Sequence, residues 1–221
     1  SSSSLIRYLL ENSEEYNWQI RVVDQSLDLV KSKLNGHKNG VALNFDALNP
    51  DQRRPEISKS DLVISMLPAR FHVEVAKDCI EFRTDLITPS YISPEMKQLD
   101  EAAKKAGIVI MNEIGVDPGI DHMSAMKIIH EIKSKGGSVE SFKSYCGGLI
   151  APESDDNPWN YKFTWNPRNV ILAGQGGAAC FIRNGQYKYI PYNRLFSRLD
   201  KLSIPGYGDF IGYPNRDSLS Y

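Results

Sequence analysis

Residues that can bind a nucleotide follow several predicted strands of this chain. Asp24 ends a predicted strand at 18–24, and Asp46 ends another at 40–46. An acid at the end of the second strand of a dinucleotide fold accepts hydrogen bonds from a ribose diol. Such an acid also repels the 2′-phosphate of NADP, and no arginine follows Asp24 closely, so this residue favours NAD. The alternative for Asp24 is a turn residue that simply ends its strand.

The opening serines precede a predicted helix that carries Leu5, Ile6, Leu9 and Leu10 at helical spacing. Ser1 and Ser2 would therefore lie where a dinucleotide fold offers the N-terminus of its first helix to a pyrophosphate. The glycine-rich turn that normally accompanies this feature is not in the sequence. Helix capping or a cloning remnant is the alternative explanation.

A turn of glycine, proline and aspartate, GVDPGIDH at 115–122, separates a predicted strand from a helix. Asp117 would lie at the carboxyl edge of the sheet. The alternative is plain N-capping, with Asp121 as the capping residue. His122 has no partner at the spacing of metal ligands. Cys79, Cys146 and Cys180 also lack such spacing, so we expect no metal site.

Two residues in the second half could contribute to a site. Cys146 lies beside two glycines at the end of a predicted strand, and a buried core thiol is its default interpretation, as it is for Cys79. Arg216 lies in the polar turn GYPNRDS. Arginine suits two-point capture of a carboxylate, although an arginine in such a turn can also be a surface residue.

Strands and helices alternate through the first half of the chain. Strands are predicted at 18–24, 40–46, 61–68, 85–90 and 108–114, with helices between them, including one that begins at Pro94 after the cap Ser93 and ends at Gly107. The apolar strands 61–68 and 108–114 are expected to be buried on both faces. This alternation predicts a Rossmann-like, doubly wound parallel sheet, which binds ligands at the carboxyl ends of its strands. Those ends are Asp24, Asp46, Met66-Leu67-Pro68, Pro89-Ser90-Tyr91 and 115–119.

The pattern changes after Asp121. We expect a helix that ends at Gly136-Gly137, an alternating strand at 138–149, a helix at 168–175 and a hairpin at 179–191 that turns at Asn184-Gly185. The last segment, 206–221, is loop-like. A domain boundary near residue 116 and a mixed sheet beyond it follow from this change.

Composition excludes several classes of protein. The 221 residues carry 26 basic and 27 acidic side chains, so a nucleic-acid binder with a broad basic face is not expected. No apolar run approaches the roughly 20 residues that cross a bilayer. Three widely spaced cysteines favour a reducing compartment. We therefore expect a soluble, cytoplasmic protein that binds neither nucleic acid nor membrane.

Four motifs occur along the chain: SYISPEM, NEIGVDPGIDHMSAM, YCGGLIAPESDDNPWNYKFTW and GYPNRDS. Together they resemble the saccharopine dehydrogenase (L-glutamate-forming) family, also called saccharopine reductase. The resemblance implies a Rossmann-like dinucleotide-binding domain at 1–116 that lacks its first strand. It also implies an incomplete α/β substrate domain at 117–221. The chain then looks like an excerpt of a longer protein that is expected to form a homodimer, and the isolated excerpt could be active or inactive.

The implied reaction is the oxidation of saccharopine by NAD(P)+ and water to L-glutamate and 2-aminoadipate 6-semialdehyde, or the reverse, in lysine metabolism. The resemblance implies catalytic roles for Tyr91, Asp117 and Cys146. Substrate binding is implied for Ser90, Tyr91, Asp117 and Arg216. Cofactor binding is expected for Ser1, Ser2, Asp24, Asp46, Met66, Leu67, Ser90, Val116, Asp117, Pro118 and Trp165. Because Asp24 favours NAD, we expect an NAD-preferring enzyme of lysine breakdown, with NADP as the alternative cofactor.

Three other functions fit the same sequence. The protein could be a related reductase that acts on another carboxylated secondary amine, a non-catalytic dinucleotide-binding regulatory domain, or a scaffold domain that binds a partner. A substrate panel separates the first from saccharopine oxidation. A thermal shift with the nucleotide separates the scaffold domain from the other functions, since a ligand stabilises the fold that binds it and the scaffold domain would not bind the nucleotide.

Overall fold

The computed structural model describes residues 2–164, 167–173, 177–214 and 217–219. The chain divides into two compact units, Ser1–Ile128 and Ile129–Tyr221. This division falls inside a continuous helix, α7 (Ile120–Ser134), whereas the sequence predicts a domain boundary near residue 116. Each unit is described by itself.

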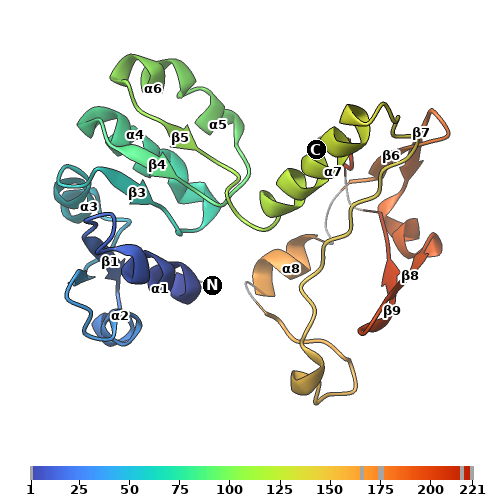
Figure 1. Cartoon of the computed structure of the whole chain (residues 1–221), viewed down its shortest axis with the longest axis horizontal. Coiled ribbons are helices and arrows are strands. Elements are labelled where there is room, and N and C mark those ends of the chain that lie inside the picture. Colours follow the sequence, from blue (N-terminus) through green and yellow to red (C-terminus); the bar gives the residue numbers. More distant parts are fainter. Residues whose placement is uncertain (1, 165–166, 174–176, 215–216, 220–221) are drawn as a thin grey trace. The chain divides into compact units, whose positions relative to one another are not determined.

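The first unit alternates strands and helices, and all its strand pairs are parallel (Figure 1). One ladder joins β1 (Ile20–Asp24) to β2 (Gly40–Asn44), and a second joins β3 (Leu62–Ile64), β4 (Asp85–Ile87) and β5 (Ile110–Met111). The intervening helices are α1 (Ser2–Asn12), α2 (Leu27–Leu34), α3 (Pro50–Ile57), α4 (His72–Phe82), α5 (Pro94–Lys97) and α6 (Asp100–Ala106). The Rossmann-like α/β class is confirmed.

Capping residues begin and end these helices. The Ser26 hydroxyl accepts a hydrogen bond from the Leu29 N–H at the start of α2, and Asn35 ends that helix in the left-handed conformation. Pro50 is the first residue of α3, with Asn49 as its cap. The Ser93 hydroxyl caps α5 through the Met96 N–H.

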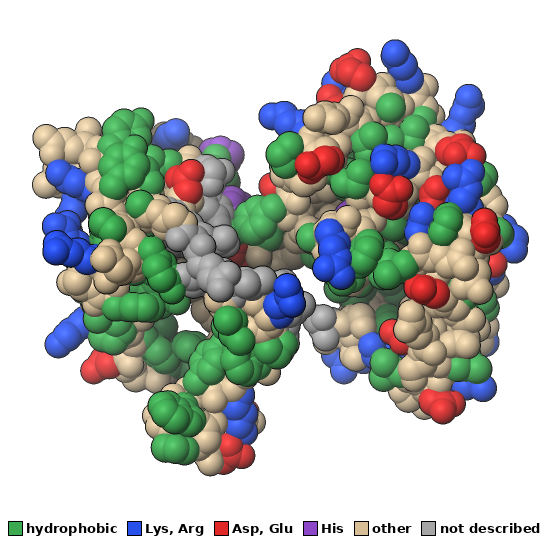
Figure 2. Space-filling view, turned by 180° about the vertical axis from the view of Figure 1, so that it is seen from behind, with side chains coloured by type: hydrophobic (Ala, Val, Ile, Leu, Met, Phe, Trp, Pro, Cys, Tyr) green, Lys and Arg blue, Asp and Glu red, His purple; other side chains and the backbone are tan. Residues whose placement is uncertain are grey.

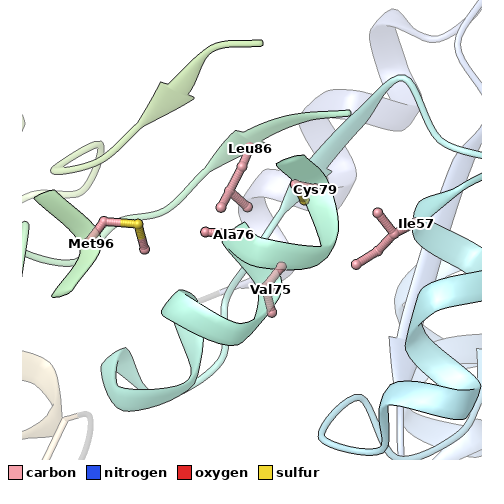
Figure 3. Close-up of a cluster of buried hydrophobic side chains, with 6 residues drawn as sticks. All are labelled: Ile57, Val75, Ala76, Cys79, Leu86 and Met96. Atoms are coloured by element: carbon pink, nitrogen blue, oxygen red, sulfur yellow. The ribbon is translucent and has the colours of Figure 1, made fainter. Parts of the chain in front are cut away.

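The main core of the first unit lies under α4. Val75, Ala76 and Cys79 of this helix form one cluster with Leu86 of β4, Ile57 and Met96 (Figure 3). Cys79 is completely buried, which confirms its predicted place in the core. A second cluster packs α1 and α2 over β1 and β2 through Ile6, Leu10, Val30 and Leu34.

Burial on both faces is wrong for the strands at 61–68 and 108–114. Val63 and Ile110 pack against the core, but their neighbours Leu62 and Met111 are each 46% exposed. Successive side chains of a strand point to opposite faces, and α4 covers one face of this ladder. Both regular strands are also shorter than their apolar runs.

The single helix predicted from Pro94 to Gly107 is two helices, α5 and α6. Leu99 lies between them, and its N–H donates to the Met96 carbonyl over a tight, three-residue step. This break lets Leu99 pack against the core of the first unit. The helix start at Pro94 and the left-handed stop at Gly107 are confirmed.

The second unit contains two antiparallel hairpins and α8 (Pro167–Ala173). Strands β6 (Ala179–Arg183) and β7 (Gln186–Ile190) turn at Asn184-Gly185, as predicted. Strands β8 (Asp200–Ile204) and β9 (Gly208–Gly212) form the other hairpin, so the loop predicted for 206–221 is wrong where β9 lies. Residues 138–150 form no strand, because no described segment pairs with them.

Few hydrophobic side chains of the second unit are buried among the described residues. Ala179 and Ile190 are the buried ones, whereas Phe142, Trp159 and Tyr187 are more than half exposed. Figure 2 shows hydrophobic side chains at the surface of this unit.

In the described part of the chain, no helix is long and apolar enough to cross a membrane. Short 3-10 turns at Ala69–Phe71, Pro152–Ser154 and Tyr192–Ser197 complete the described elements.

Candidate functional site at the carboxyl edge of β3, β4 and β5

Two loops meet where β4 and β5 end. These strands are parallel, so the segments that follow them leave from the same edge of the ladder. The Ile114 N–H donates to the Thr88 carbonyl at 3.2 Å, and the Glu113 N–H donates to the Ser90 carbonyl at 3.0 Å. The Glu113 carboxylate also accepts from the Ile92 N–H at 3.1 Å. These bonds hold the Ser90-Tyr91 segment against the segment that leads to Asp117.

The tight turn at 115–119 positions Asp117. The Gly115 N–H donates to the Pro118 carbonyl at 2.8 Å, and the Asp117–Pro118 peptide bond is cis. Gly119 has φ +146°, and a Cβ at this position would lie 2.2 Å from the Gly115 carbonyl oxygen, so only glycine fits there. The turn buries Pro118 and leaves Val116 and Asp117 exposed.

Tyr91 and Asp117 form the central pair of the site. The Tyr91 hydroxyl donates a hydrogen bond of 2.6 Å to Asp117 Oδ1, although 26 residues separate them in sequence. Tyr91 is 49% exposed, so both groups can contact a ligand. A phenol and a carboxylate in contact can hold or pass a proton, and the carboxylate can pair with an ammonium group. The structure thus brings together two residues that the sequence placed at separate strand ends.

A buried histidine, which the sequence analysis missed, connects two strand ends at this edge. His72, at the start of α4, is 2% exposed. Its Nδ1 lies 2.9 Å from Ser65 Oγ and its Nε2 lies 2.9 Å from Ser90 Oγ. Burial lowers the pKa of His72 below its ordinary value, which favours the neutral ring. The sequence offers only one signal for this residue, a histidine that follows the end of the strand predicted at 61–68, and this signal alone does not indicate a site.

Met66 and Leu67 follow Ser65 at the end of β3. The Ser65 N–H donates to the Ile87 carbonyl of β4 at 2.9 Å, which fixes this third strand end beside the other two. Met66 is 44% exposed, whereas Leu67 packs partly against the core. Met66 is therefore the more accessible of the two predicted cofactor contacts.

Asp121 does not cap α7, contrary to the alternative considered for this turn. It lies within the first turn of the helix, and its carboxylate accepts from the Gly119 N–H at 2.8 Å and contacts His122 Nδ1 at 2.7 Å. The Asp121 carboxylate is thus hydrogen-bonded within its own turn, whereas Asp117 presents an exposed carboxylate.

The other predicted cofactor residues of the first unit lie on the β1–β2 ladder or on α1. Asp24 Oδ1 accepts from the Ser26 N–H at 2.9 Å, and Asp46 Oδ1 accepts from the Leu48 N–H at 2.9 Å. Each acid therefore stabilises the turn after its strand, as the alternative for Asp24 proposed. The Ser2 hydroxyl accepts from Lys33 Nζ at 2.7 Å. Ser1 lies outside the described residues.

The predicted site residues of the second half are only partly described. Cys146 is exposed, so its default interpretation as a buried thiol is wrong. It belongs to a segment without regular structure, which explains why no core forms around it. Trp165 and Arg216 lie outside the described residues.

A groove of about 550 Å³ lies elsewhere in the first unit, between α3 and α4. Its charges are already paired: Asp78 contacts Arg53 at 2.7 Å and Arg54 at 2.9 Å, and Arg54 also pairs with Glu81. These contacts join the two helices, so we assign the groove a structural role. None of its lining residues belongs to the strand edge described above.

Two family models match the chain and together span nearly all of it. Residues 2–111 match the model described as the saccharopine dehydrogenase NADP binding domain, and residues 115–221 match the saccharopine dehydrogenase C-terminal domain. The chain belongs to the saccharopine dehydrogenase family. This result confirms the resemblance found in the sequence motifs.

Relatives with curated names agree with the family assignment. The chain is 43% identical over 204 residues to a saccharopine dehydrogenase [NADP(+), L-glutamate-forming] of Pyricularia oryzae, which covers 92% of this chain and 45% of that protein. It is 42% identical to the protein of the same name from Schizosaccharomyces pombe, covering 98% of this chain and 47% of that one. An alpha-aminoadipic semialdehyde synthase of Arabidopsis thaliana is 41% identical, covering 97% of this chain and 20% of that protein.

A solved structure also matches across the chain. It is an apo saccharopine dehydrogenase (L-Glu forming) from Saccharomyces cerevisiae, with a TM-score of 0.86 and 38% identity. The match covers 98% of this chain and 48% of the yeast chain. The chain thus spans about half the length of the fungal family members that it matches.

The preference for NAD inferred from Asp24 finds no support in these matches. The matching nucleotide domain is described as NADP binding, and the two fungal relatives are named for NADP(+). The Asp24 carboxylate instead accepts a hydrogen bond from the Ser26 N–H within its own turn.

Proposed function

We propose that the full-length protein containing this chain oxidises saccharopine to L-glutamate and 2-aminoadipate 6-semialdehyde. One observation carries the proposal: the Tyr91–Asp117 pair lies at the carboxyl edge of a parallel ladder, in a chain that belongs to the saccharopine dehydrogenase family. The names of the fungal relatives support this substrate.

The reaction consumes one water and one oxidised nucleotide for each saccharopine. A hydride leaves the carbon beside the secondary amine, and the bond between this carbon and the nitrogen becomes the C=N bond of an imine. Water adds to that carbon, and the carbinolamine then breaks its C–N bond to release the amine of glutamate and the aldehyde. The nicotinamide ring supplies the chemistry of accepting the hydride. One proton is released to solvent in the overall balance.

We assign the chain's own residues roles in this scheme that agree with their geometry. The exposed Asp117 carboxylate pairs with the secondary ammonium of the substrate before the hydride leaves. The Tyr91 hydroxyl, 2.6 Å from Asp117, orients this carboxylate and can pass a proton to or from it. Ser90, on the adjacent position, hydrogen-bonds an oxygen of the ligand. Cys146 and Arg216 remain proposed contacts to the substrate within residues 117–221.

We further propose NADP as the nucleotide, bound within residues 1–116. Support comes from the description of the matching domain and from the names of the fungal relatives. The residues present suit a dinucleotide, since the parallel strands β3, β4 and β5 end at one edge and the segments that follow them carry Met66, Ser90 and Asp117. In such folds the nucleotide lies across the carboxyl ends of the strands.

A substrate panel on the full-length protein tests this proposal. The protein is mixed with NADP+ or NAD+ and with saccharopine, a carboxylated polyamine or no amine, and formation of the reduced nucleotide is followed by absorbance. We expect reduction with saccharopine and NADP+. Turnover of the polyamine instead would favour the related reductase, and nucleotide binding without any turnover would favour a regulatory domain.

A further inference from the structure

The contacts of His72 determine which of its two ring nitrogens carries the proton. Its ring is buried and lies between two hydroxyl groups, Ser65 Oγ at Nδ1 and Ser90 Oγ at Nε2, both at 2.9 Å. A neutral imidazole has one N–H donor and one acceptor nitrogen. One serine must therefore donate to the ring, and the other must accept from it.

Ser65 settles this choice. It is 4% exposed, and among the described residues the only hydrogen-bond partner of its side chain is His72. If Nδ1 carried the proton, the Ser65 hydroxyl hydrogen would be buried without an acceptor, which is unfavourable. Ser65 therefore donates to Nδ1, and the proton of the ring lies on Nε2.

The other end of the ring then determines what Ser90 can do. His72 Nε2–H donates to Ser90 Oγ, so the Ser90 hydroxyl hydrogen is free to point away from the ring. Ser90 is only partly buried and lies next to Tyr91, whose hydroxyl contacts Asp117. This arrangement presents a hydrogen-bond donor beside an acidic pair.

We propose that His72 is a positioning residue that, through its Nε2–H tautomer fixed by Ser65, makes Ser90 a hydrogen-bond donor to an oxygen of the bound ligand. The oxygen is either a substrate carboxylate or the carboxamide of the nicotinamide. The inference rests on the proposed function for the identity of the ligand, but the tautomer itself does not.

The first test is independent of activity. The full-length protein is labelled with ¹⁵N-histidine, and long-range ¹H–¹⁵N correlations identify which nitrogen of His72 carries the proton. The expected result is a neutral ring protonated at Nε2. A ring protonated at Nδ1 overturns the proposal even if the enzyme oxidises saccharopine. Absence of saccharopine turnover would instead count against the proposed function and leave this measurement intact.

The second test is a double-mutant cycle of Ser65→Ala and Ser90→Ala in the full-length protein. Ser65→Ala is expected to raise one KM, for saccharopine or for the nucleotide, by about threefold to tenfold with kcat little changed, because one donor bond to the ligand is weakened. The ligand whose KM rises identifies the oxygen. When Ser65→Ala is added to a protein that already carries Ser90→Ala, it should raise neither KM further.

Two controls separate positioning from a general loss of structure. Ser60→Ala removes a serine hydroxyl that bonds the Glu56 carbonyl, away from the site, and should leave both KM values unchanged. Melting curves show whether Ser65→Ala destabilises the fold. Unchanged KM values in Ser65→Ala, or effects of Ser65→Ala and Ser90→Ala that add, would overturn the proposal.

Discussion

The Tyr91 hydroxyl and the Asp117 carboxylate are the residues on which the proposed chemistry depends most. Their 2.6 Å hydrogen bond uses the phenolic hydrogen, which leaves the second carboxylate oxygen of Asp117 available to a cationic amine. Both side chains are exposed, so the pair contributes little to folding. Changes at this pair should therefore alter activity more than stability.

Tyr91→Phe tests this distinction. We expect kcat/KM for saccharopine to fall by about tenfold, because a hydrogen bond to a charged group is lost at the proposed substrate site. Thermal stability should change by less than about 0.5 kcal/mol. Steady-state kinetics and a melting curve check both values. Tyr187→Phe, which removes the hydroxyl of an exposed tyrosine on β7, is the matched control. Equal kinetics for wild type and Tyr91→Phe would contradict the assigned role.

Asp24→Asn tests the charge at the end of β1. If NADP places its 2′-phosphate near this strand end, removing the carboxylate charge should raise kcat/KM for NADP+ about fivefold, the effect of about 1 kcal/mol of repulsion in water. The value for NAD+ should change less. Asparagine retains an oxygen that can accept from the Ser26 N–H, so the turn is preserved. Asp51→Asn, in the first turn of α3, is the control. If the ratio of kcat/KM for NADP+ to kcat/KM for NAD+ is unchanged, the 2′-phosphate does not lie near Asp24.

Single residues were predictable where the chain itself places them at a strand end. Met66 and Ser90 lie at the carboxyl ends of predicted strands and Asp117 follows another, and parallel pairing brings these ends to one edge. His72 was missed because its importance comes from burial between Ser65 and Ser90, which no local pattern reveals. Cys146 was misjudged because its exposure depends on what packs around it rather than on the glycines beside it.

At the scale of elements, α4 organises the first unit. It contributes Val75, Ala76 and Cys79 to the core, and its buried Asp78 pairs with Arg53 of α3. Burial raises the pKa of the Cys79 thiol from its ordinary value of 9.0 to about 12, and the nearby Asp78 charge acts in the same direction. The helix therefore holds a neutral thiol against β4.

This shift predicts how stability depends on pH. Between pH 9.0 and about pH 12 the unfolded chain releases the Cys79 proton while the folded chain keeps it, so stability should fall as pH rises, by up to about 1.4 kcal/mol per pH unit. Cys79→Ala removes this contribution. Denaturant unfolding of both proteins, compared from about pH 8 to about pH 11, measures the difference in slope. Parallel slopes would mean that the thiol titrates normally in the fold.

Helices were predicted better than strands because helix ends carry local signals. Ser93 caps the start of α5 and Gly107 ends α6, where the sequence places these two residues. Strand extent depends on pairing, which is not local: the apolar run at 108–114 contributes only Ile110–Met111 to a strand. Neither strand of the hairpin β8–β9 was predicted, because the two strands form by pairing with each other rather than from a local sequence signal.

At the scale of the whole molecule, the two units differ in how well they are packed. The first unit has two buried clusters, whereas the hairpins of the second bury Ala179 and Ile190 among the described residues. Two-stranded hairpins are marginally stable without further packing. The many exposed aromatic side chains of the second unit agree with this weakness.

Residues 129–221 expressed alone should therefore bind a hydrophobic dye and melt without a sharp transition. The full-length protein should bind the dye weakly and melt cooperatively, because further packing covers these side chains. Dye fluorescence and calorimetry of the two proteins make the comparison. A sharp, cooperative transition for residues 129–221 alone would show that the unit folds without further packing.

The central claim is that the full-length protein couples saccharopine cleavage to reduction of a nicotinamide nucleotide. The most direct test measures L-glutamate and NADPH together after saccharopine and NADP+ are added. The proposed reaction predicts that L-glutamate and NADPH form in equal amounts. NADPH without L-glutamate, or neither product from a protein that binds the nucleotide, would contradict the account.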